Sequence, residues 1–291
     1  MTRKAHMDAI GAAALIAFAL HLAFNQVVIK ITNGGFGPVF MAGLRSAGAL
    51  VILLMWMRYR RLDLHLPRAS WFGGVMSGLF FAFEFLFLFN ALDLTTVGRA
   101  SILFYSMPVW LSLAAHFCIP GERLSPLRIL GLVLAVGGVA LAVLDREAGS
   151  GALTGDLLAL LGAMCWAGIA LCVRVTPLSE VPAEQQLLWQ LMISAPILLL
   201  LAPFLGDLLR EVTALHLAGL AFQIVAVASF GFLFWFWLMK IYPAGAVASF
   251  SFLSPVFAVL LGWALLDEVV EWTVWAALAL VAVGIFLINR R

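Results

Sequence analysis

The stretch FEFLFLFN at residues 83–90 decides the fold, because the chain carries a second version of it, FGFLFWFW, at residues 230–237. The two runs share phenylalanine or leucine at five positions. Composition alone can produce such a match in an apolar chain. At the same displacement, however, a glycine and a proline also recur, namely Gly98 with Gly245 and Pro108 with Pro255. These matches indicate an internal repeat of about half the chain length. Such a repeat has to be recognised before the fold is assigned.

The composition indicates that this chain lies in a lipid bilayer. Of its 291 residues, 64% are hydrophobic and 11% are charged, whereas soluble domains carry about 25% charged residues. So few charges cannot cover a water-facing surface of this size. The net charge of +2 gives no indication of nucleic-acid binding. The three cysteines lie within apolar runs and are interpreted as small apolar residues, not as a disulfide or metal set.

The apolar runs predict an all-α integral membrane protein with ten transmembrane helices. Each run has about the 20 residues that a membrane-spanning helix needs, and no alternating barrel-type pattern is present. We expect the spans at residues 9–30, 38–57, 69–90, 97–118, 127–144, 154–175, 184–205, 215–239, 244–266 and 272–289. The first run follows Arg3 and Lys4, as in a signal peptide, but it continues to Ile29 and is expected to remain a helix.

Basic residues predict the orientation of these spans. The segments on the side of the N-terminus hold twelve Lys and Arg residues, and the opposite segments hold four, so both termini are expected in the cytoplasm. Each repeat then has five spans, in residues 1–146 and 152–291. Because five is odd, the second repeat enters the membrane from the opposite side. Two inverted five-helix repeats are typical of secondary transporters, with the binding site between the repeats.

Four short motifs resemble a known family. MPVW at 107–110 and PGE at 120–122 in the first half, with SPVF at 254–257 and LLDE at 265–268 in the second, are similar to the drug/metabolite transporter superfamily, EamA family. Within it, the aromatic content and the ten-helix form look most like the YddG-type aromatic amino-acid exporters. The resemblance implies alternating-access export across the inner membrane of amino acids, aromatic and large apolar ones favoured. The alternative is export of drugs or other small metabolites.

Glu84 is the most conspicuous candidate for the binding site, because it is a carboxylate in the middle of a predicted span. An Asp at such a depth costs about 2.5–3.5 kcal/mol on insertion scales. Its helical neighbours include Phe81. Two interpretations of Glu84 remain open. Glu84 binds a substrate ammonium or a proton in a cavity, or it forms a structural pair with Arg45 or His21.

Other polar and aromatic residues predict the lining of a central cavity. They share helix faces at one-turn spacing or lie at repeat-related positions, and for each of them core packing is the alternative. The expected substrate-binding set is His21, Asn25, Phe81, Glu84, Ser101, Tyr105, Trp166 and Phe252. Pro108 and Pro255 each remove a helical hydrogen bond in mid-span, which predicts either moving hinges or fixed bends.

The sequence holds no motif of an enzyme. HExxH, GxSxG and a phosphate-binding glycine loop are all absent. We therefore expect no catalytic residues, no metal and no cofactor. The expected partners are a small-molecule substrate and the lipid bilayer, without a requirement for an oligomer. A non-transport membrane protein and an intramembrane enzyme remain as remote alternatives.

Overall fold

The computed structural model describes residues 8–119, 121–122, 124–144, 150–242 and 253–289. Within these ranges the regular secondary structure is helical, apart from one isolated antiparallel bridge between Phe36 and Leu209. The α-helices are α1 (Ala9–Thr32), α2 (Pro38–Tyr59), α3 (Trp71–Leu94), α4 (Val97–Phe104), α5 (Met107–Cys118), α6 (Pro126–Leu144), α7 (Ser150–Val175), α8 (Ala183–Leu201), α9 (Ala214–Phe222), α10 (Phe232–Ile241), α12 (Leu253–Leu266) and α13 (Trp272–Asn289). Shorter elements are the 3-10 turns η1 (Arg68–Ser70), η2 (Pro177–Glu180) and η3 (Ala202–Phe204) and the π-helical segment η4 (Gln223–Gly231).

The helices have the length and composition of membrane spans. Eight helical stretches in the described ranges are long and apolar enough to cross a membrane, and two shorter apolar helices, Leu253–Leu266 and Trp272–Ile288, follow them. The prediction of an all-helical chain is thus confirmed for the part of the chain that the structure describes. Of the predicted span 244–266, only residues from 253 onward fall within the described ranges.

Pro108 divides the predicted helix 97–118 in two. α4 ends at Phe104, and α5 begins at Met107 with Pro108 in its first turn. Proline has no N–H to donate to the preceding turn, and the first turn of a helix is where that loss is tolerated. The single helix expected from the sequence is therefore two helices that share one membrane span, Val97–Cys118.

The segment that leads into the second aromatic run differs from its counterpart in the first half of the chain. Gln223–Gly231 is π-helical, whereas its counterpart at the displacement of 147 residues, 76–84, lies inside the regular helix α3. π-helical segments are rare and occur frequently at functional sites. The π-helical segment ends at Gly231, which is the repeat counterpart of Glu84.

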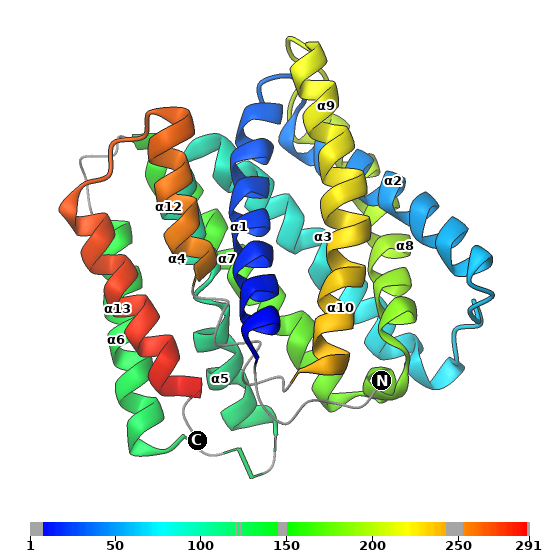
Figure 1. Ribbon diagram of the computed structural model, residues 1–291, viewed down its shortest axis with the longest axis horizontal. Helices are drawn as coiled ribbons and strands as arrows, with labels where there is room; N and C mark the ends of the chain where they lie inside the picture. The colour runs from blue at the N-terminus through cyan, green and yellow to red at the C-terminus, as the bar shows by residue number, and fades with distance from the viewer. Residues whose placement is uncertain (1–7, 120, 123, 145–149, 243–252, 290–291) are drawn as a thin grey trace.

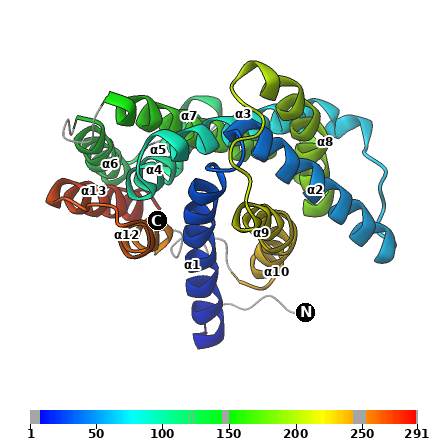
Figure 2. The same ribbon diagram turned by 90° about the horizontal axis from the view of Figure 1, so that it is seen from above.

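Two helix pairs flank a central group (Figures 1 and 2). α6 packs against α13 on one side of the bundle and α2 against α8 on the other, while α1, α3, α4, α7 and α12 pack between them. Glycines allow the close approach of α6 and α13. A Cβ at Gly131 would lie 2.6 Å from the Gly284 carbonyl oxygen.

The long helix α7 defines two opposite ends of the bundle. Its first turns carry Asp156, which contacts the start of α4, and its last turn carries Arg174, which contacts the segment after α5. We name these the Lys30 end and the Arg174 end, since Lys30 in the last turn of α1 lies at the former. The Lys30 end also includes the end of α3, which accepts a hydrogen bond from Lys30, and the segment after α12, which accepts one from the start of α4.

Candidate functional site

Glu84 lies in the middle of α3 and is buried, with 5% of its surface exposed. Within the described residues it has no ion pair within 4.0 Å and no hydrogen bond. Arg45 on α2 is within electrostatic range, but its guanidinium carbon lies over the ring of Phe85, 4.1 Å from the centroid. Among the described residues, Arg45 Nε has no hydrogen-bond partner. The structure therefore shows a buried carboxylate and a buried guanidinium that are near one another without forming a salt bridge.

Aromatic side chains of α7, of α4 and of Tyr105 directly after α4 form a wall that includes one ring, Tyr105, within electrostatic range of Glu84. The rings of Phe104 and Trp166 are stacked, with centroids 5.0 Å apart, and Tyr105 meets Trp166 edge-on at 5.6 Å. Gly162 on α7 allows this approach, because a Cβ there would lie 3.3 Å from the Phe104 ring and 3.5 Å from the Glu84 carbonyl oxygen. Tyr105 is also within electrostatic range of Glu84. The structure thus brings together three predicted site residues: Glu84, Tyr105 and Trp166.

His21 belongs to a second group, formed by α1, the π-helical segment η4 and α10. It lines a mainly apolar pocket of about 530 Å³ between α1 and the η4–α10 segment. The pocket residues are Ala17, Phe18, His21, Ala226, Phe230, Gly231, Leu233 and Phe234. His21 Nε2 is buried and has no hydrogen-bond partner among the described residues. A Cβ at Gly231 would lie 3.7 Å from that nitrogen, so the glycine leaves space next to it.

Phe81 contacts α10 next to the His21 pocket. It lies on α3 one turn before Glu84, and its ring centroid is 6.3 Å from that of Phe232 on α10. Phe232 directly follows Gly231, which lines the His21 pocket. The contact between Phe81 and Phe232 therefore brings α3, one turn from Glu84, against α10 beside the His21 pocket.

The remaining predicted site residues have different positions. Asn25 on α1 and Ser101 on α4 are buried, and both Asn25 Oδ1 and Ser101 Oγ have no hydrogen-bond partner in the described parts of the chain. Pro255 lies in the first turn of α12 as described. Phe252 lies outside the described residues. Unsatisfied polar atoms in a buried site are atoms that a polar substrate or water could pair with.

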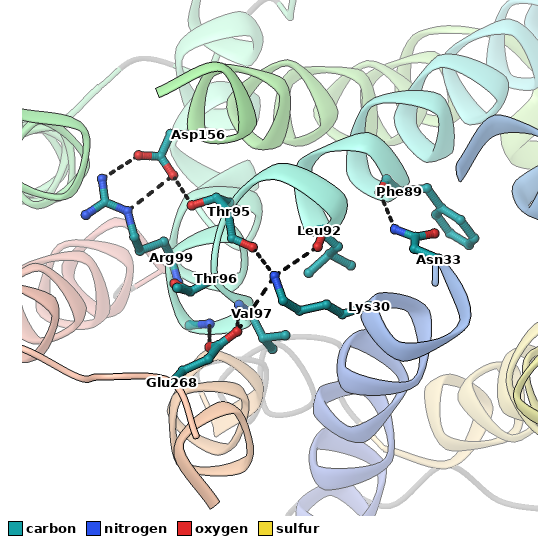
Figure 3. Close-up of polar contacts among 11 residues, drawn as sticks. Lys30, Asn33, Phe89, Leu92, Thr95, Thr96, Val97, Arg99, Asp156 and Glu268 are labelled. Carbon is teal, nitrogen blue, oxygen red and sulfur yellow. Dashed lines mark hydrogen bonds and ion pairs between the residues drawn. The ribbon is translucent and has the colours of Figure 1, made fainter. Parts of the chain in front are cut away.

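A polar cluster at the Lys30 end was not predicted as a site (Figure 3). Lys30 Nζ donates to the carbonyl oxygens of Thr95, at 2.5 Å, and Leu92, at 3.2 Å, and lies 3.9 Å from Glu268 Oε1. Beside it, Arg99 forms a buried ion pair with Asp156 at 2.5 Å. From the sequence, Lys30 and Arg99 contributed only to the orientation of the spans, and Glu268 only to the LLDE motif. The signal that could have identified Lys30 is its repeat relation to Arg174, since the runs 21–30 and 165–174 both end in a cation.

Comparison with known proteins adds the family. The model of the EamA-like transporter family matches the chain twice, over residues 9–144 and 153–290. The chain is 24% identical over 279 residues to the uncharacterized transporter YoaV of Bacillus subtilis (strain 168), covering 94% of each. It is 27% identical over 282 residues to the probable amino-acid metabolite efflux pump of Escherichia coli (strain K12), covering 90% of this chain and 89% of the pump. A solved structure with 23% identity shares the fold, with a TM-score of 0.65 and coverage of 95% of this chain and 96% of the other. The chain belongs to the EamA-like transporter family.

Proposed function

We propose that this transporter exports amino acids, aromatic and large apolar ones favoured, across the cytoplasmic membrane. The observation that carries the proposal is the unpaired, buried carboxylate of Glu84 beside the rings of Phe104, Tyr105 and Trp166. A carboxylate suits the ammonium group of an amino acid, and an aromatic wall suits an apolar side chain. The name of the Escherichia coli relative, a probable amino-acid metabolite efflux pump, points to the same substrate class.

The proposal includes the layout of the membrane spans. Ten spans form two inverted five-helix repeats, residues 1–146 and 152–291, with both termini in the cytoplasm. The two matches of the family model, which fall on either half of the chain, support this division. The excess of basic residues on the side of the N-terminus supports the orientation. Alternating access then exposes the Glu84 region first to one side of the membrane and then to the other.

The binding role of the site residues belongs to the same proposal. Glu84 binds the ammonium, Phe81, Tyr105 and Trp166 contact the side chain, and Asn25 and Ser101 offer hydrogen bonds to the carboxylate. His21 lines the neighbouring pocket. Phe252 is proposed by its repeat relation to Tyr105. Pro108 and Pro255 are the proposed hinges.

Counterflow in proteoliposomes tests the substrate class. Vesicles loaded with unlabelled phenylalanine should take up external labelled phenylalanine, tryptophan and leucine faster than protein-free vesicles. Labelled glutamate and lysine are the matched controls, because their charged side chains do not suit the aromatic wall. Uptake of a cationic drug without any amino-acid exchange would instead favour the alternative, an exporter of drugs or other small metabolites.

A further inference from the structure

The guanidinium of Arg45 is buried without an anion in contact with it. Arg45 lies on α2 with 3% of its surface exposed. It takes part in no salt bridge of the described residues, and its Nε has no hydrogen-bond partner among them. A guanidinium carries five N–H donors in a fixed fork, and a buried charge is normally paired. The free donors of Arg45 therefore favour an acceptor that is not part of the chain.

Two phenylalanines of α3 hold this guanidinium in place. Its carbon lies 4.1 Å from the ring centroid of Phe85 and 5.8 Å from that of Phe89, and the two rings meet edge to face. An aromatic face attracts the positive charge, but it does not replace the oxygen acceptors that the N–H fork of an arginine matches. Because Phe85 directly follows Glu84 on α3, the contact also keeps Arg45 close to that carboxylate.

Glu84 and Arg45 are unlike charges that are near one another and not joined. Each is within electrostatic range of the other, yet they form no salt bridge. A single molecule that carries a cation and an anion on neighbouring atoms can pair with both. An α-amino acid is such a molecule. Its carboxylate suits the forked donors of Arg45, and its ammonium suits the carboxylate of Glu84.

The internal repeat shows that helix packing does not require these two charges. The counterpart of Glu84 is Gly231, and the counterpart of Arg45, at a displacement of 145 residues, is Gln190. Gln190 is a buried neutral amide that donates to Ser77 Oγ on α3 at 3.1 Å. At the corresponding position of the second repeat, a neutral side chain with a partner is thus sufficient. Both charges belong to the first repeat alone, as expected for a binding site and not for a shared element of the fold.

We propose that Arg45 is the ligand of the substrate carboxylate and that, together with Glu84, it restricts the site to zwitterions. The inference rests on the proposed export of amino acids and deepens it. Glu84 pairs with the ammonium, Arg45 pairs with the carboxylate, and the aromatic wall contacts the side chain. An amine without a carboxylate leaves Arg45 unpaired, and an acid without an ammonium leaves Glu84 unpaired. Both are therefore disfavoured, because a buried charge without its partner is costly.

Binding to the purified full-length protein in detergent tests this role. A ligand that binds the native state raises the melting temperature by mass action, so titrations yield a Kd for each ligand. The three ligands share a phenyl ring: phenylalanine has both charges, phenethylamine lacks the carboxylate and phenylpropionate lacks the ammonium. The unmodified protein should bind phenylalanine at least about tenfold more tightly than either analogue, which is the lower range for a hydrogen bond to a charged group.

Two variants should change this selectivity in opposite directions. Arg45→Met should abolish the preference for phenylalanine over phenethylamine and keep the preference over phenylpropionate, because Glu84 still pairs with the ammonium. Glu84→Gln should keep the first preference and abolish the second. A purely structural role of Arg45 would lower the melting temperature without exchanging these two ratios. Arg58→Met makes the same change at an exposed position of α2, and this matched control should keep both preferences.

The outcomes separate this inference from the proposed function. If Arg45→Met retains the tenfold preference over phenethylamine while amino-acid counterflow is observed, the inference is overturned and the export of amino acids stands. If the unmodified protein neither binds phenylalanine nor exchanges amino acids, the proposed function fails, and the inference fails with it. Should Arg45→Met not fold, Arg45→Lys keeps the charge and removes the fork. The preference over phenethylamine should then decrease, and an undiminished preference would overturn the inference.

Discussion

The guanidinium of Arg45 lies over the ring of Phe85, with 4.1 Å between its carbon and the ring centroid, and it forms no salt bridge with Glu84. The two charged groups are nevertheless buried on neighbouring helices, at 3% and 5% exposure. A cation above an aromatic face gains about 2 kcal/mol when it is desolvated. The Phe85 ring thereby stabilises the Arg45 guanidinium, and Arg45 does not need a salt bridge with the carboxylate of Glu84. The proposed role of Glu84 requires such a carboxylate, without a salt bridge to Arg45.

Glu84→Gln should abolish most transport while leaving the protein folded. The amide keeps the size of the side chain but cannot balance a substrate ammonium. We expect counterflow to fall by about tenfold or more, which corresponds to about 1.4 kcal/mol of lost interaction, with an unchanged melting temperature. Glu211→Gln, which neutralises an exposed carboxylate, should transport like the unmodified protein.

A purely structural role of Glu84 would give different results. If Glu84 serves only to balance Arg45, Glu84→Gln should lower the melting temperature and the added change Arg45→Met should restore it. Undiminished transport by a well-folded Glu84→Gln protein would remove Glu84 from the binding site. Purified variants in detergent, measured by thermal unfolding and then reconstituted, distinguish these cases.

The helical class of the chain and the approximate places of most apolar helices followed from the sequence, because membrane spans of about 20 apolar residues leave few alternatives. The burial of Glu84 was predictable for the same reason. The direction in which Arg45 points was not, since a helical pattern apolar on all sides does not reveal which neighbour a side chain meets. The pairing of Lys30 with Glu268 joins residues from the two halves of the chain, and only the repeat relation hinted at it. The break between α4 and α5 did not follow from the sequence as a separate helix start. The π-helical turn at Gln223–Gly231 has no signal in the sequence that we can identify.

Cysteine labelling should reveal opposite sides for the two ends of the bundle. With native cysteines replaced, a cysteine at Leu64, in the exposed segment between α2 and α3, should react from the cytoplasm. A cysteine at Glu211, in the exposed segment before α9, should react from outside. A membrane-impermeant maleimide applied to intact cells and to inverted vesicles measures both. The same sidedness at both positions would contradict the proposed orientation of the repeats.

Adjacent glycines on α6 should respond differently to the same substitution. A Cβ at Gly138 would lie 2.8 Å from the Ala277 carbonyl oxygen on α13, whereas a Cβ at Gly137 meets nothing within 4 Å. Gly138→Ala should therefore force the two helices apart and cost about 1–3 kcal/mol, as overpacking does. Gly137→Ala should be neutral or slightly stabilising, because alanine favours the helix. Thermal unfolding of the two variants measures the contrast, and equal melting temperatures would show that α6 and α13 are not closely packed there.

Asp156→Ala should destabilise the protein far more than Asp93→Asn. Asp156 is fully buried and accepts from Thr95 and Arg99, and Arg99 also donates to the Ala142 carbonyl oxygen. Removing the carboxylate takes the balancing negative charge from the buried Arg99 guanidinium, which costs about 3–5 kcal/mol in comparable pairs. Asp93 pairs with Arg210 at 2.9 Å, but both side chains are partly exposed. The loss of such a pair costs about 1 kcal/mol or less.

The Arg99–Asp156 and Asp93–Arg210 pairs should also differ in their double variants. The question is how much of the stability lost by changing the aspartate is recovered when the arginine is changed as well. Asp156→Ala with Arg99→Met removes both buried charges, so we expect it to recover most of the stability that Asp156→Ala alone loses. For the double change Asp93→Asn with Arg210→Gln, the loss in the free energy of unfolding should be close to the sum of the two small single losses. Unfolding in detergent, with counterflow measured on the folded fraction, follows all four variants. If Asp156→Ala unfolds no more readily than Asp93→Asn, the Arg99–Asp156 pair does not anchor α4 to α7, and the stability of the Lys30 end must come from its apolar packing.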